Sequence, residues 1–102
     1  MEQLTTVTAV DELAERELAA FPLTGKRIAI AKVDDAFYAF GDICTHQGCS
    51  LAEGELDGTT VTCPCHGSEF DVTTGEVLRG PAREPVRSYP VRIEDGLLRV
   101  EV

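Results

Sequence analysis

The chain has 102 residues, 43% of them hydrophobic, and a formal net charge of −9, which suits one small folded domain. The charge argues against nucleic acid as a partner, because binding phosphates requires clusters of Lys and Arg. No apolar run approaches the roughly 20 residues of a membrane helix, and the acidic N-terminus does not resemble a signal peptide, so we expect a cytoplasmic protein with no membrane segment.

The first forty residues alternate polar and apolar positions in a way that predicts β-strands. Residues 4–10 are rich in Thr and Val and indicate a first strand. Asp11 is a candidate cap for a short helical turn over residues 11–14, and a strand is expected to follow it and run to Leu23. Residues 26–33 and 36–40, joined by a turn at Asp34-Asp35, predict a hairpin.

From Gly41 the alternation gives way to Cys, His, Gly, Pro and acidic residues. Only short strands are expected here, around residues 59–62, 69–72 and 77–78, before a reversal at 80–82. Strand character returns over 86–93 and 97–102, which a turn at 94–96 joins as a hairpin. The pattern predicts a β base formed by residues 1–40 and 83–102, with a loop-rich subdomain at 41–82 inserted between its strands.

Every Cys and His of the chain lies in one of two short runs, which are Cys44-Thr45-His46-Gln47-Gly48-Cys49 and Cys63-Pro64-Cys65-His66-Gly67-Ser68. Two Cys and two His on two loops suit a metal centre whose ligands differ at its two ends. They also suit a structural zinc site. Zinc fingers, however, group like ligands together, whereas each loop here supplies both kinds.

The two motifs, together with the Phe70-Asp71 that follows the second, closely resemble the Rieske iron–sulfur family. The resemblance is close over residues 41–82 and looser over the whole chain, whose length matches a bare Rieske ferredoxin. It implies an all-β fold, in which a Rieske-type antiparallel β-sandwich base carries an inserted cluster-binding subdomain. It also implies one 2Fe–2S cluster. Gly75 and the turn that contains Pro81 fall where the cluster-covering loops of that family lie.

By position, the resemblance assigns the thiolates of Cys44 and Cys63 to the inner iron and one imidazole nitrogen each of His46 and His66 to the outer iron. Because imidazole is a neutral ligand, such a centre is easier to reduce than one with four thiolates, with a potential of about −150 to +300 mV. Gly48 and Gly67, like the other glycines of the segment, suit tight turns in which backbone N–H groups approach sulfide.

Cys49 and Cys65 remain as a pair. They could be two small buried thiols, since disulfides are uncommon in the cytoplasm. The resemblance instead implies a disulfide between the two loops, as in the Rieske proteins of quinol-oxidising complexes. Ferredoxins that serve ring-hydroxylating oxygenases usually lack both residues. A bridge beside a cluster can be shielded from thiol exchange, and we therefore expect the disulfide.

Two residues after the second loop bear on the potential. Ser68 lies where the quinol-oxidising subgroup donates a hydroxyl hydrogen bond to a cluster sulfur, and Phe70 lies where that subgroup has a Tyr that bonds a ligand cysteine. A donor to sulfur stabilises the reduced state, which Phe cannot do. We therefore expect a potential between those of quinol-oxidising centres and oxygenase ferredoxins. Otherwise Ser68 is a turn residue and Phe70 a core residue.

The resemblance implies a one-electron carrier rather than an enzyme, placed between a flavoprotein reductase and a terminal oxygenase or oxidase. With both His on iron, no Ser–His–Asp triad is possible. The alternatives are a small electron-transfer subunit of a larger oxidoreductase, either arsenite-oxidase-like or quinol-oxidising, and a structural zinc module.

Residues 41–81 hold seven acids against the single base Arg79. This excess is either a solvated face or a surface that docks on a basic patch of the partner. The acids are Asp42, Glu53, Glu55, Asp57, Glu69, Asp71 and Glu76.

Overall fold

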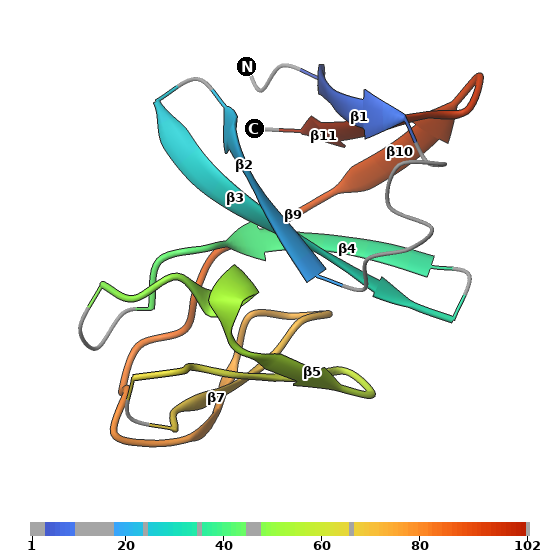
Figure 1. Cartoon of the computed structure of the whole chain (residues 1–102). Coiled ribbons are helices and arrows are strands. Elements are labelled where there is room, and N and C mark those ends of the chain that lie inside the picture. Colours follow the sequence, from blue (N-terminus) through green and yellow to red (C-terminus); the bar gives the residue numbers. More distant parts are fainter. Residues whose placement is uncertain are drawn as a thin grey trace.

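The computed structural model describes residues 4–9, 18–23, 25–34, 36–44, 48–65 and 67–101, which form three antiparallel sheets (Figure 1). The first sheet has the order β1-β11-β10 and contains β1 (Leu4–Ala9), β10 (Val91–Glu94) and β11 (Leu97–Glu101). The second has the order β2-β3-β4-β9 and contains β2 (Leu18–Leu23), β3 (Lys26–Val33), β4 (Ala36–Gly41) and β9 (Ser88–Tyr89).

The third sheet lies below the second in Figure 1 and belongs to the segment between β4 and β9. Its order is β5-β6-β7-β8, with β5 (Glu55–Asp57), β6 (Thr60–Thr62), β7 (Glu69–Asp71) and β8 (Val77–Arg79). A single 3₁₀ turn, η1 (Leu51–Glu53), precedes β5. The predicted all-β fold and both predicted hairpins, β3–β4 and β10–β11, are confirmed. The helical turn expected at 11–14 lies outside the described residues.

The middle sheet is covered on both faces. The residues of β3 from Ile28 to Ala31 are all fully buried and alternate between two cores. Ile28 and Ile30 pack in a core shared with β11, whereas Ala29 and Ala31 pack in a core shared with β6 and β7. Successive strand residues point to opposite faces. The sequence Ile-Ala-Ile-Ala therefore places large side chains against the first sheet and small ones toward the third.

The strand character predicted over residues 86–93 is divided between two strands that belong to different sheets. The chain forms β9, which pairs with β4, and then β10, which pairs with β11, and Pro90 separates the two. Proline has no N–H to donate to a ladder, while its carbonyl oxygen accepts a hydrogen bond from the N–H of Glu101 at 2.9 Å. Pro90 is therefore the point at which the chain passes from the second sheet to the first.

The short elements η1 and β5 were also missed by the sequence pattern. Elements of three residues contain too few positions for a periodicity to be recognised. No segment among those described forms a helix with the length and hydropathy needed to cross a membrane.

Candidate metal centre

The two cysteine-containing loops lie at the same end of the third sheet, on the left in Figure 1. The first leaves the end of β4 and leads into η1, and the second connects β6 to β7. Cys44 and Cys63, which begin the two motifs, are each only 2% exposed and belong to one buried core. The fold therefore brings together two residues that the sequence places nineteen positions apart.

The two loops share one backbone hydrogen-bonding pattern. The N–H of Cys44 donates to the carbonyl of Cys49 at 2.8 Å, and the N–H of Cys63 donates to that of Ser68 at 2.7 Å. In the reverse direction, the N–H of Gly48 donates to Cys44 and that of Gly67 donates to Cys63. In both loops the bonds join the same relative positions, so Cys44 and Cys63 occupy equivalent places.

Gly48 and Gly67 close these turns with φ angles of +75° and +79°. This left-handed conformation costs a residue with a Cβ atom about 1–2 kcal/mol. Both glycines are thus required by the backbone of the loops, as the sequence predicts.

A disulfide joins Cys49 to Cys65 and so links the two loops directly, as expected from the sequence. Cys65 is exposed and Cys49 partly buried. The sulfur atoms of Cys49, Cys63 and Cys65 all lie within 4.8 Å of one another. The bridge therefore lies immediately beside one of the predicted ligands, while Cys44 and Cys63 remain as thiols.

The donor set at this position fits an iron–sulfur centre. Two thiol groups that are almost wholly buried provide soft ligands, which suit iron–sulfur clusters and can be stabilised as thiolates by a metal. The other predicted ligands, His46 and His66, lie outside the described residues. The structure accordingly places two of the four predicted ligands and leaves the imidazoles as predictions.

Residues predicted to surround the centre lie in two different environments. Ser68 and Phe70 are fully buried, and the hydroxyl oxygen of Ser68 accepts a hydrogen bond from the N–H of Ala82 at 3.0 Å. This bond fixes the segment containing Pro81 against the second loop. Pro81 itself is exposed. Phe70 packs in the same core as Cys44 and Cys63, so it is a core residue as well as a neighbour of the loops.

The acidic segment does not form one solvent-facing surface, because Asp42 lies inside the protein. Its side chain is fully buried, and its carboxylate accepts hydrogen bonds from Arg27, Ser50 and Ala52. The carboxylate of Asp71 stabilises the turn after β7, because it accepts hydrogen bonds from both the N–H and the hydroxyl of Thr73. Four of the seven acidic residues are exposed: Glu53, Glu55, Asp57 and Glu76.

Sequence reasoning missed the role of Asp42. Its burial depends on Arg27, which lies 15 residues away in β3. No local pattern contains both partners, although an acid two positions before a ligand cysteine is a weak signal.

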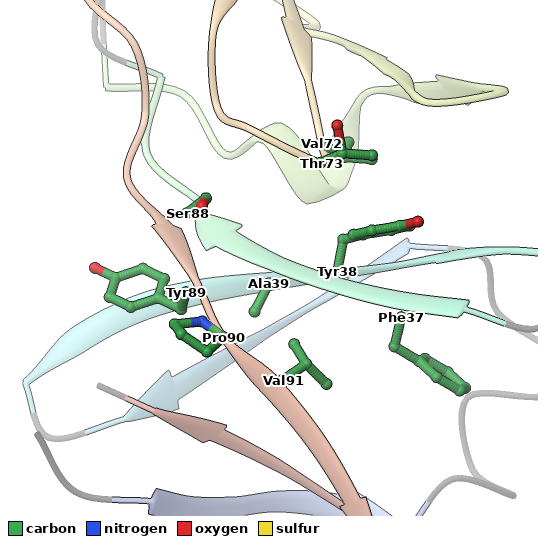
Figure 2. A pocket seen from close by; sticks show the side chains of 9 residues that line it. All are labelled: Phe37, Tyr38, Ala39, Val72, Thr73, Ser88, Tyr89, Pro90 and Val91. Carbon is green, nitrogen blue, oxygen red and sulfur yellow. The ribbon is translucent and has the colours of Figure 1, made fainter.

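A pocket of about 460 Å³ lies between β4, the β9–β10 segment and the turn at Val72–Thr73 (Figure 2). Tyr38 points from one face of β4 toward that turn, whereas Phe37 and Ala39 point from the other face. The lining residues include neither of the cysteine loops and no charged side chain. The pocket thus lies where the second sheet and the third sheet meet, and its lining contributes no donor to the metal centre.

Comparison with known proteins places the chain in a family. The family model described as "Rieske [2Fe-2S] domain" matches residues 3–90. The chain is 40% identical over 94 residues to the anthranilate 1,2-dioxygenase ferredoxin subunit of Burkholderia cepacia, covering 92% of this chain and 87% of that protein. It is 41% identical over 101 residues to the ferredoxin component of the p-cumate 2,3-dioxygenase system of Pseudomonas putida, covering 97% and 86%.

Solved structures agree in fold. The ferredoxin of carbazole 1,9a-dioxygenase from Nocardioides aromaticivorans superimposes with a TM-score of 0.92 at 28% identity, covering 97% of each chain. A chain in the complex of reduced oxygenase and oxidised ferredoxin of carbazole 1,9a-dioxygenase gives 0.90 at 33% identity, covering 96% of this chain and 92% of that one. These findings favour an iron–sulfur cluster over the alternative of a structural zinc site. The chain belongs to the Rieske [2Fe-2S] domain family, and its cofactor is one Rieske 2Fe–2S cluster.

Proposed function

We propose that this protein is a Rieske ferredoxin that takes single electrons from a flavoprotein reductase and passes them to a terminal ring-hydroxylating oxygenase. The observation that carries the proposal is the extent of the similarity. The chain spans 87% and 86% of two ferredoxins named as components of dioxygenase systems, and 97% of a solved ferredoxin of the same kind. The likeness thus covers nearly the whole carrier rather than one motif.

Four residues are proposed to hold the cluster. Cys44 and Cys63 bind one iron and His46 and His66 the other, an assignment that the equivalent hydrogen bonding of the two loops supports. When bound, the cluster supplies a one-electron couple at a potential that neutral imidazole ligands raise. The protein keeps the two thiolates out of water, and the Cys49–Cys65 bridge holds the two loops at a fixed separation. The cluster-binding subdomain is proposed to span residues 41–82.

The proposed docking surface combines the loop ends with nearby acids. Pro64 and Cys65 are exposed at the second loop. Glu53, Glu55 and Asp57 are exposed on η1 and β5, which follow the first loop directly. A partner with a basic patch would be attracted to this side of the molecule, because complementary charges raise the rate of encounter.

A second candidate function is that of a small electron-transfer subunit in a quinol-oxidising complex. The specific observation in its favour is the Cys49–Cys65 disulfide, which the sequence resemblance associates with that subgroup. Since the relatives are dioxygenase ferredoxins, the first function is preferred. The cytoplasm remains the proposed location, and fractionation of cells that produce the protein tests it.

Stopped-flow mixing separates the two functions. The reduced holoprotein is mixed with an oxidised terminal oxygenase of the anthranilate or p-cumate type and, separately, with an oxidised c-type cytochrome. We expect rapid electron transfer to the oxygenase and, in steady state with a flavoprotein reductase, product formation that depends on this protein. Reduction of the protein by a quinol, with transfer to the cytochrome and none to the oxygenase, would contradict the proposal.

A further inference from the structure

The necks of the two cysteine loops, where each loop joins the rest of the fold, are built differently. The second loop stands on paired strands, with Thr62 opposite Glu69 and Val61 opposite Phe70. The first loop has no such ladder among the described residues. Its two sides meet at an isolated bridge between Ile43 and Ser50, and beyond that bridge they lead into β4 and η1. Fewer paired backbone positions hold the neck of the first loop, so side-chain contacts can contribute more to it.

The side chain of Asp42 occupies this position. Its Oδ1 accepts a hydrogen bond from the N–H of Ala52 at 2.8 Å, and its Oδ2 accepts one from the hydroxyl of Ser50 at 2.7 Å. The backbone carbonyl of Asp42 also accepts a bond from the N–H of Leu51 at 2.7 Å. One residue thus contacts all three residues at the far side of the neck.

Asp42 also connects this neck to the base. Arg27, in β3 of the middle sheet, donates from Nε to Oδ2 at 2.7 Å, and the N–H of Asp42 donates to the carbonyl of Arg27 at 3.0 Å. The carboxylate is fully buried whereas the arginine side chain is 54% exposed. A buried charge needs both a counter-charge and hydrogen bonds. Arg27 provides the counter-charge and one hydrogen bond, and Ser50 and Ala52 provide the other hydrogen bonds.

We propose that Asp42 is a positioning residue for the metal ligand Cys44. Asp42 lies two residues before the Cys44 thiolate, and its carboxylate joins the start of the first loop to Ser50 and Ala52, which follow the loop. The Cys49–Cys65 disulfide joins the first loop to the second. Asp42 acts through the loop backbone, because its buried carboxylate contacts Arg27, Ser50 and Ala52. This role rests on the proposed function only in that Cys44 binds iron.

The test uses the holoprotein and three variants that each remove one connection, which are Asp42→Asn, Ser50→Ala and Arg27→Gln. Two quantities are measured below the onset of unfolding. These are the rate at which visible absorption is lost in the presence of an iron chelator and the EPR spectrum after reduction. Ser50→Ala leaves all charges unchanged, so an effect of this variant cannot be an effect of charge. Asp71→Asn is the matched control, because the carboxylate of Asp71 accepts two bonds within the turn after β7 and none from the residues that form the neck of the first loop.

For Asp42→Asn we expect cluster loss about 10- to 100-fold faster than in the unsubstituted protein, the usual effect of removing a residue that orients a ligand. We also expect altered g values, and smaller changes of the same kind for Ser50→Ala and Arg27→Gln. Asp71→Asn should leave both readouts unchanged even where it lowers the unfolding temperature. If Asp42→Asn does not fold, the other two variants decide.

The proposal is overturned if Asp42→Asn, or in its absence both other variants, lowers the unfolding temperature but leaves cluster loss and the EPR spectrum unchanged. That outcome would make Asp42 a residue of the fold alone. Failure of the proposed function looks different, because then the unsubstituted protein itself would show no transfer to an oxygenase, whatever the variants do.

Discussion

Ser68 has one observed role and one proposed role for its hydroxyl group. Its oxygen accepts the N–H of Ala82 at 3.0 Å, and a hydroxyl group that accepts a hydrogen bond can also donate one. Because both residues are buried, losing this oxygen would leave the N–H of Ala82 without its partner, at a cost of about 1–3 kcal/mol. The same hydroxyl is the proposed donor to a cluster sulfur.

Ser68→Ala is expected to lower both stability and midpoint potential. A hydrogen bond worth about 1 kcal/mol more in the reduced state corresponds to roughly 40 mV for a one-electron couple. Its loss should shift the potential downward by that order, as measured by redox titration followed by visible circular dichroism. Ser88→Ala, at an exposed serine, is the control. An unchanged potential in Ser68→Ala would remove the proposed donor.

Phe70→Tyr should have the opposite effect on the potential. Phe70 is fully buried in the core that contains Cys44 and Cys63, so an added hydroxyl can donate to a ligand sulfur. We expect the midpoint potential to rise by roughly 40 mV for each 1 kcal/mol of differential stabilisation. Phe37→Tyr adds the same hydroxyl beside the other core and should leave the potential unchanged. A potential that stays constant or falls in Phe70→Tyr contradicts this account.

Single residues could be predicted from the sequence where chemistry restricts them strongly. The cysteines are such a case, because every Cys and His lies in two short motifs. Asp42 could not be predicted in this way, since its burial follows from Arg27, Ser50 and Ala52, which meet only in the folded chain. The sequence therefore predicted one exposed acidic surface, whereas Asp42 is buried and accepts hydrogen bonds from three residues.

At the level of elements, Gly75 holds the turn after β7 against the chain that leads to β9. Its φ is +85°, and its carbonyl accepts the N–H of Val86 at 2.9 Å. A Cβ atom at this position would collide with the carbonyl oxygen of Val86. The turn thus depends on a glycine both for its conformation and for space.

Gly75→Ala should therefore destabilise the protein more than Gly58→Ala does. Gly58 also has a positive φ, +61°, but a Cβ atom there meets nothing within 4 Å. Gly58→Ala should lower the free energy of unfolding by about 1–2 kcal/mol, and Gly75→Ala by about 1–3 kcal/mol more because of the collision. Denaturant unfolding of both variants measures the difference. Equal losses would show that space at Gly75 does not matter.

Elements differed in how well the sequence predicted them. The β3–β4 and β10–β11 hairpins were predicted because apolar runs are bounded by clear turn residues. The division of the expected 86–93 strand at Pro90 was readable in principle, since proline interrupts a ladder, but the flanking residues suit strands on both sides. Which sheet each half joins is decided by packing and not by local sequence.

On the scale of the whole molecule, two groups of acidic residues lie in different parts of the fold. Glu53, Glu55 and Asp57 are exposed along η1 and β5, the two elements that follow the first cysteine loop in the chain. Glu94, Asp95 and Glu101 lie on the β10–β11 hairpin, in the sheet on the opposite side of the middle layer (Figure 1). The two groups have the same charge but differ in their distance from the proposed electron-transfer site.

Neutralising the first group by Glu53→Gln, Glu55→Gln and Asp57→Asn together should slow association with the oxygenase about tenfold or more at low ionic strength. The rate should also depend less on salt, because salt screens the attraction that remains in the unsubstituted protein. Stopped-flow rates at several salt concentrations measure both effects. The matching change at Glu94, Asp95 and Glu101 is the control. Equal slowing by the two sets would mean that net charge, rather than a docking surface, sets the rate.

We propose that two thiolates and two imidazoles hold the 2Fe–2S cluster of this chain. Low-temperature EPR of the dithionite-reduced protein, with the histidines labelled with ¹⁵N, tests it most directly. We expect a rhombic spectrum whose average g value lies below that of four-thiolate clusters, with hyperfine coupling from the nitrogens of two imidazoles. A colourless protein that contains zinc, or a reduced cluster without nitrogen coupling, would contradict it.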